Sequence, residues 1–159
     1  MFRSGRFDIH VYGPDGMLER KIRRPADSLP VMASDLTAWI EAQLAPLPPI
    51  ADVRAGMRAS FERVTPADFI PLVQSLVVDA EGNLWVESGR HAEDLLATYS
   101  VFDAGGAWLG DVTLDGGMEV LEIGDDFVIV LVRDELDVES VRLLALERPS
   151  ASTAITSSD

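Results

Sequence analysis

The chain has 159 residues, of which 47% are hydrophobic and 25% are charged, and its formal net charge is −14. These values predict one folded domain rather than a disordered chain. The negative charge argues against nucleic acids and anionic membranes as partners, because both are bound by clustered Lys and Arg, and the absence of cysteine excludes disulfides and a Cys nucleophile.

The first predicted element is a β-hairpin over 7–23. Phe7, Ile9 and Val11 alternate with more polar residues, which is the period of a half-buried strand. The stretch 13–16 contains the Gly, Pro and Asp residues of a tight turn, after which the second strand returns.

A helical insert is predicted over 24–69. Ser34 or Asp35 can cap its first helix, and Pro46 ends that helix because proline lacks a backbone N–H. One helical face is predicted to carry Leu36, Trp39, Ile40 and Leu44. A second helix is predicted over about 51–63, and Trp39 is expected to attach the insert to the rest of the fold.

Seven further strands are predicted: 72–78, 83–87, 98–102, 108–114, 118–123, 127–132 and 138–146. Runs of short strands separated by turns rich in Gly and Asp favour a sandwich, a barrel or a propeller. The stretch 127–132 is apolar throughout, which predicts a central strand covered on both faces. The tail, 149–159, is small and polar and is predicted to be disordered.

Two of the predicted hairpins are alike in sequence. Val11–Gly16 aligns with Val101–Gly106, and the two share the valine, an aromatic residue and the final glycine. Once the helical stretch 25–67 is removed, they lie close to one propeller blade apart, about 40–50 residues. Two unrelated hairpins with the same turn chemistry would also give this match.

The residues from Leu76 to Arg148 resemble part of a known family. The stretches 76–86 and 101–110 look like the two successive hairpins of an NHL-type blade, and 121–139 resembles the closing blade of bacterial six-bladed β-propeller proteins of unassigned function. The resemblance implies a mainly β partial propeller of about two blades, with roughly nine antiparallel strands in a single domain over 1–148. It implies no catalytic residue.

On this interpretation the last blade lacks its outermost strand. Open strand edges present unpaired N–H and C=O groups that pair with other chains. The chain is therefore predicted to form a homo-oligomer through its edges, or to refold locally and cover them.

Binding is predicted on the face opposite the tight turns, where the connections are expected to be long. That face would carry the insert and the loops 88–97 and 133–137. The candidate ligand-facing residues are Arg90, His91, Glu93, Asp94, Asp134, Glu135 and Asp137. A solvated histidine and a solvated acidic loop would explain the same residues without a ligand.

Other side chains receive structural interpretations. Trp85 and Trp108 are predicted to fill the space between blades. Asp134, Glu135, Asp137 and Glu139 have the carboxylate oxygens that Ca²⁺ prefers, but they lack the spacing of an EF-hand. No metal ligand is assigned, and Ca²⁺ is the one cofactor left open.

The first functional hypothesis is a non-enzymatic binding or assembly module with an unknown small-molecule or protein ligand. An alternative is a lactonase-like or lyase-like enzyme with His91 near the acidic loops, which depends on analogy between folds. A third is a fragment without independent activity. As written, the chain carries no signal peptide and is expected in the cytoplasm, whereas a fragment of a longer precursor would be exported.

Overall fold

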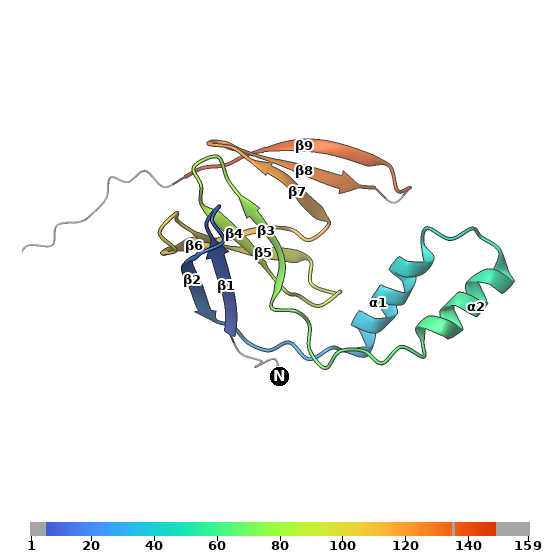
Figure 1. Cartoon of the computed structure of the whole chain (residues 1–159). Helices are drawn as coiled ribbons and strands as arrows, with labels where there is room; N and C mark the ends of the chain where they lie inside the picture. The colour runs from blue at the N-terminus through green and yellow to red at the C-terminus, as the bar shows by residue number, and fades with distance from the viewer. Residues whose placement is uncertain (1–5, 135, 149–159) are drawn as a thin grey trace, which may run out of the picture.

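The structure is a computed structural model that describes residues 6–134 and 136–148 (Figure 1). Within these residues the fold is mainly β, with three antiparallel sheets and two helices. Neither of the two described helices is long and apolar enough to cross a membrane. The predictions for the tail, 149–159, and for Glu135 fall outside the described residues.

The described elements follow in this order: β1 (Arg6–Tyr12), β2 (Leu18–Pro25), α1 (Ala33–Leu44), α2 (Ala51–Phe61), β3 (Val73–Val78), β4 (Leu84–Ser88), β5 (Leu96–Phe102), β6 (Trp108–Asp115), β7 (Met118–Ile123), β8 (Phe127–Arg133) and β9 (Glu139–Ala145). We call β1–β2 the first sheet, β3–β6 the middle sheet and β7–β9 the third sheet. The predicted strands and the two-helix insert are confirmed, with shifts of a few residues at their ends.

Four of the hairpin turns share one geometry, in which the first residue exchanges backbone hydrogen bonds with the fourth and fifth. These turns begin at Gly13, Asp79, Asp103 and Asp134. The fourth residue has a positive φ in every case: Gly16, Gly82, Gly106 and Asp137. Glycine adopts this conformation without a steric penalty, and Asp is one of the few other residues that tolerate it. The shared turn explains why the hairpins are alike in sequence.

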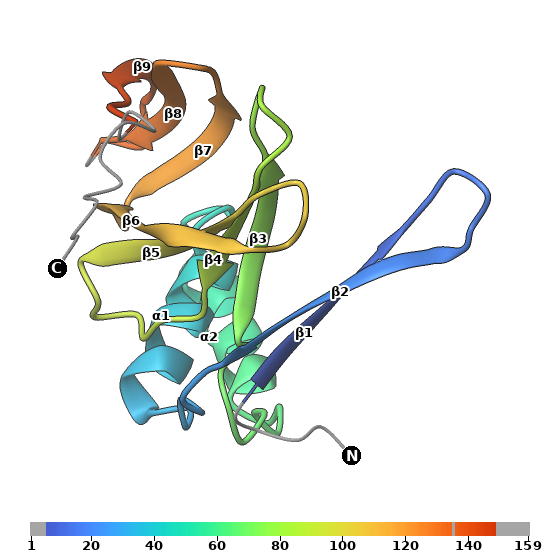
Figure 2. The same cartoon turned by 90° about the vertical axis from the view of Figure 1, so that its left-hand side faces the viewer.

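The middle sheet lies between the other two sheets, as the edge-on views show (Figures 1 and 2). One of its faces packs on the first sheet through Phe7, Ile22, Val86 and Phe102. Its other face packs on the third sheet through Trp85, Ala97, Tyr99, Val101, Ile123, Val128 and Val130. Each buried apolar side chain of this size stabilises the fold by about 1.5–3 kcal/mol, so the two interfaces hold the three layers together.

Some apolar faces of the sheets are incompletely covered. Val128 and Val130 of β8 are buried against the middle sheet, but Ile129 and Leu131 on the other face are only half-buried. The prediction that this strand is covered on both faces is therefore wrong, because no described element packs on its outer side. Apolar residues of β3 are also exposed: Leu76 by 50% and Val78 by 63%.

Two arginines join the outer sheets to the middle sheet. Arg24 of β2 donates two hydrogen bonds to the carboxylate of Asp111, at 2.6 and 3.0 Å. The Arg24 guanidinium lowers the pKa of Asp111 to about 2. Arg24 also lies 4.8 Å from the ring centre of Trp108, which is 54% exposed. Trp108 therefore does not fill a buried space as predicted, whereas Trp85 does.

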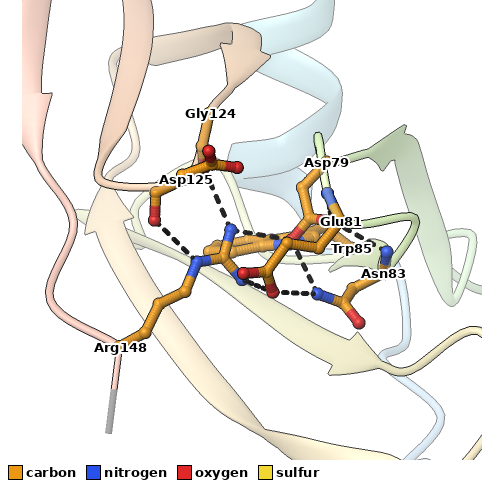
Figure 3. A network of polar contacts seen from close by, with 7 residues as sticks. All are labelled: Asp79, Glu81, Asn83, Trp85, Gly124, Asp125 and Arg148. Carbon is orange, nitrogen blue, oxygen red and sulfur yellow. Dashed lines mark hydrogen bonds and ion pairs between the residues drawn. The ribbon is translucent and has the colours of Figure 1, made fainter. Parts of the chain in front are cut away.

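The second arginine, Arg148, follows β9 and reaches into the β3–β4 turn (Figure 3). Its guanidinium binds the carboxylates of Asp79 at 2.9 Å and Glu81 at 3.1 Å, and it also donates to the Gly124 carbonyl oxygen. The Asp79 side chain is fully buried. Burial alone would raise the pKa of Asp79, but the hydrogen bonds from Asn83, Trp85 and Arg148 outweigh it and hold the pKa below its usual value.

The two helices of the insert pack mainly on each other. Trp39 of α1 makes an edge-to-face contact with Phe61 of α2, with 5.5 Å between ring centres, and remains 40% exposed. The predicted role of Trp39 in attaching the insert to the sheets stays a prediction, since Trp39 also lines the groove beside β3 and β7. The segments that lead into and out of the insert pair through a bridge between Pro30 and Phe69.

Candidate functional site

A groove of about 910 Å³ opens between α1, β3 and β7. Its apolar lining includes Ala38, Trp39, Ala42, Val77, Met118 and Val120. Its ionisable lining consists of Asp35, Glu87, Arg90, His91, Tyr99, Glu119 and Arg133. The volume lies within the range of about 300–1,000 Å³ that small-molecule sites occupy.

Asp35 joins the insert to the loop between β4 and β5. One carboxylate oxygen lies 2.9 Å from His91 Nδ1 and accepts the Met32 N–H of the helix start, while the other accepts the Ala92 N–H at 2.8 Å. The hydrogen bond from Ala92, followed by those from Met32 and His91, lowers the pKa of Asp35 to about 2. Asp35 is therefore ionised at neutral pH, and it holds the loop against the first turn of α1.

Arg90 fixes the other side of the same loop. Its guanidinium donates to the carbonyl oxygens of Asp94, at 3.2 Å, and Gly116, at 2.6 Å. Its Nε is buried and has no hydrogen-bond partner among the described residues, and it lies 3.9 Å from a carboxylate oxygen of Glu87. Arg90 thus ties the loop to the short link between β6 and β7.

A polar row crosses the middle sheet beneath Arg90. Ser75, Glu87 and Tyr99 are neighbours in the register of β3, β4 and β5, and Ser75 Oγ donates to Glu87 at 2.7 Å. Burial, together with the negative charge of Glu87, raises the pKa of Tyr99 to about 12. Because Tyr99 stays protonated and Glu87 is already hydrogen-bonded, this row suits holding a ligand better than transferring protons.

The structure brings only some of the predicted residues together. Arg90 and His91 line the groove, and the Asp94 carboxylate supports the loop by accepting the His91 N–H. Glu93 is exposed on this loop. Asp134 and Asp137 lie in the β8–β9 turn, where Asp134 accepts the N–H groups of its own turn.

The reason is that two connections expected to be long are short. The β6–β7 link contains only Gly116 and Gly117, and the β8–β9 connection is a tight turn. Glu135 lies outside the described residues, so its predicted role stays a prediction. Glu139 bonds to Arg133 at 2.8 Å. In the described part of the chain, no three His, Asp or Glu side chains gather as metal ligands.

The groove lining also contains residues that were not predicted as site residues, among them Asp35, Glu87 and Trp39. Asp35 carried a signal for a helix start but none for its contact with His91, because the two lie on different elements. Glu87 shares a strand face with Trp85, and nothing in its sequence neighbourhood indicates a site there. Trp39 was predicted to attach the insert to the sheets, and a role in lining a site was not predicted.

No protein-family model, no curated protein and no solved structure matches this chain.

Replacing Asp35 with alanine is expected to free the β4–β5 loop while leaving the sheets intact. The Ala92 amide loses its acceptor. Because such a hydrogen bond contributes about 1–1.5 kcal/mol, its loss is expected to make hydrogen exchange at that amide roughly tenfold faster. Glu41→Ala is the matched control, because Glu41 lies on the same helix and its carboxylate accepts a hydrogen bond from the exposed Arg58 of α2 rather than from the β4–β5 loop. Equal exchange rates at Ala92 in both variants would contradict the role of Asp35.

Proposed function

We propose that this chain is a non-enzymatic binding module built as a partial propeller, with the groove beside α1 as its ligand site. One observation carries the proposal. The two long connections of the described chain, the insert and the β4–β5 loop, meet at the groove and are joined there by Asp35 and His91. Loops held on a rigid scaffold are the usual place for binding.

Three features support the partial propeller. Consecutive sheets stack face to face in chain order, and each is a meander of antiparallel strands. The first and third sheets have two and three strands, fewer than the four of a blade. Leu76 and Val78 of β3 are exposed. This is expected in a partial propeller, because the first sheet has two strands and lacks those that would cover β3.

The lining of the groove favours binding over catalysis. Its polar side chains are largely engaged with each other or with the backbone: Asp35 with His91, and Arg90 with two carbonyl oxygens. Such groups are preorganised and cost little to order when a ligand binds. The mixed lining fits a small molecule with an apolar body and polar ends.

The test uses isotope-labelled protein and a library of small aromatic amines, carboxylates and zwitterions. Binders are expected to shift the amide signals of residues that line the groove. Ala42→Trp fills the groove from an exposed helix position and is expected to weaken these binders at least tenfold, about 1.4 kcal/mol.

The control is Ala55→Trp, which places the same side chain on an exposed position of α2 outside the groove. It is expected to leave binding unchanged. Shifts that lie elsewhere on the protein, or equal binding by Ala42→Trp, would argue against the site.

The Asp35–His91 pair favours one second candidate, a lactonase-like enzyme. An ionised carboxylate on Nδ1 orients the imidazole and leaves Nε2 as the nitrogen that can accept a proton. The partner is Asp35 of the insert and not an acidic residue of the predicted loops. This candidate would be established if wild type hydrolyses simple lactones and the rate falls at least about a hundredfold in His91→Gln. Failure of wild type to hydrolyse them would leave the binding module.

A further inference from the structure

The outer face of the third sheet is apolar and faces away from the middle sheet. Two cross-strand pairs form its centre, Ile129 with Leu143 and Leu131 with Val141. Leu143 is 68% exposed and Val141 is 64% exposed. A contiguous apolar face of this kind marks an interaction surface, because water-exposed apolar area is unfavourable.

Acidic residues flank this face. The strand register places three acidic residues on the outer side with the apolar pairs: Glu119, Glu122 and Glu139. The register places one basic residue, Arg133, on the same side. The sequence from Met118 to Arg148 holds nine acidic residues and three arginines. The partner of this face therefore has to be basic or neutral.

The opposite end of the stack carries the reverse charge. On the outer face of the first sheet, Lys21 and Arg23 share the surface with the exposed cross-strand pair of Tyr12 and Leu18. Asp8 lies on the same face and pairs with Arg23 at 3.1 Å, so two basic side chains stand against one acidic side chain there. The face thus combines an apolar patch with positive charge.

We propose that the outer face of the third sheet binds the outer face of the β1–β2 hairpin of a second copy, head to tail. The contact repeats what the chain already does twice, since each pair of successive sheets packs face to face. A symmetric contact between two third sheets would bring two acidic faces together and is disfavoured by charge repulsion. Head-to-tail contacts close into a ring or extend as a filament. This assembly goes beyond the proposed function, and Glu119 and Arg133 of this face also line the groove.

The test exchanges the charges of the two faces. The hairpin variant carries Lys21→Glu and Arg23→Glu, and the third-sheet variant carries Glu119→Lys and Glu122→Lys. Wild type at about 0.1 mM is expected to have a mass above that of a monomer by light scattering, and each variant alone is expected to associate at least tenfold more weakly. Mixing the two variants is expected to restore the association, because every contact then joins opposite charges.

Three results would overturn the proposal. If the hairpin variant associates as tightly as wild type, the contact does not use the hairpin. If wild type itself is a monomer, the two faces do not bind each other. If the mixture stays monomeric while both variants keep the wild-type melting temperature, opposite charges do not hold the two faces together. Arg23 also bonds Asp8, so the single variants Lys21→Glu and Glu122→Lys repeat the test if the double hairpin variant unfolds.

Discussion

Alanine in place of Asp79 is expected to destabilise the protein by about 3–5 kcal/mol, which is the usual loss when one partner of a buried ion pair is removed. The Asp79 carboxylate is fully buried and accepts hydrogen bonds from backbone and side-chain donors of its own turn, from the Trp85 indole N–H and from Arg148. Without it, these buried donors lose their partner. The melting temperature is expected to fall by about 10 °C, measured by circular dichroism.

Asp103→Ala is the matched control for this prediction. Asp103 occupies the first position of the same kind of turn, but among the described residues its carboxylate accepts a hydrogen bond from the Ala107 N–H of that turn alone. The expected loss is about 1 kcal/mol. Similar losses in both variants would mean that the contact between the sheets contributes little.

Acid is expected to reduce the effect of the Asp79 substitution. The pKa of Asp79 is lower in the folded protein than in the unfolded chain, where it is about 3.9. The stabilisation by its charge is therefore complete above about pH 4 and declines as the pH falls toward the folded pKa. The difference between wild type and Asp79→Ala is expected to shrink over that range.

Gly89→Ala is expected to cost about 2–3 kcal/mol through steric overlap. A methyl group at Gly89 would collide with the carbonyl oxygen of Pro71 and would lie 3.1 Å from Ile70 Cγ2. The Gly89 N–H also donates to the Leu72 carbonyl oxygen. Backbone atoms cannot yield as a flexible side chain can, so the segment that returns from the insert must move, and thermal melting records the loss.

Gly56→Ala is the control, because a methyl group there meets no atom within 4 Å and the residue lies on the exposed helix α2. Alanine is a better helix former than glycine and is expected to stabilise the protein by up to about 1 kcal/mol. A loss in Gly56→Ala similar to that in Gly89→Ala would show that close packing at Gly89 is not the cause.

Local chemistry allowed the strands and turns to be predicted well. The alternation of Phe7, Ile9 and Val11 and the Gly and Asp residues of the turns depend on neighbours within a few residues, which the sequence shows directly. The helices were located for the same reason, since Pro46 and the apolar spacing act within one or two turns.

The groove and the exposed faces could not be predicted in this way. The contacts of Asp35 with His91, of Arg24 with Asp111 and of Arg148 with Asp79 join residues far apart in the chain. Periodicity says that Trp108 faces one side of a strand, but whether that side is covered depends on which element packs there. The third sheet shows the same limit, because an apolar run does not reveal how many layers surround it.

Strand β7 gives the groove and the outer face of the third sheet a common element. Side chains alternate along it, so Met118 and Val120 pack toward the middle sheet, whereas Glu119 and Glu122 share the outer face by register. Met118, Glu119 and Val120 all line the groove. A molecule that displaces β7 from one side changes the shape presented on the other. If the proposed assembly displaces β7, thermodynamic reciprocity requires that it change the affinity of the groove by the same factor that a bound molecule changes assembly.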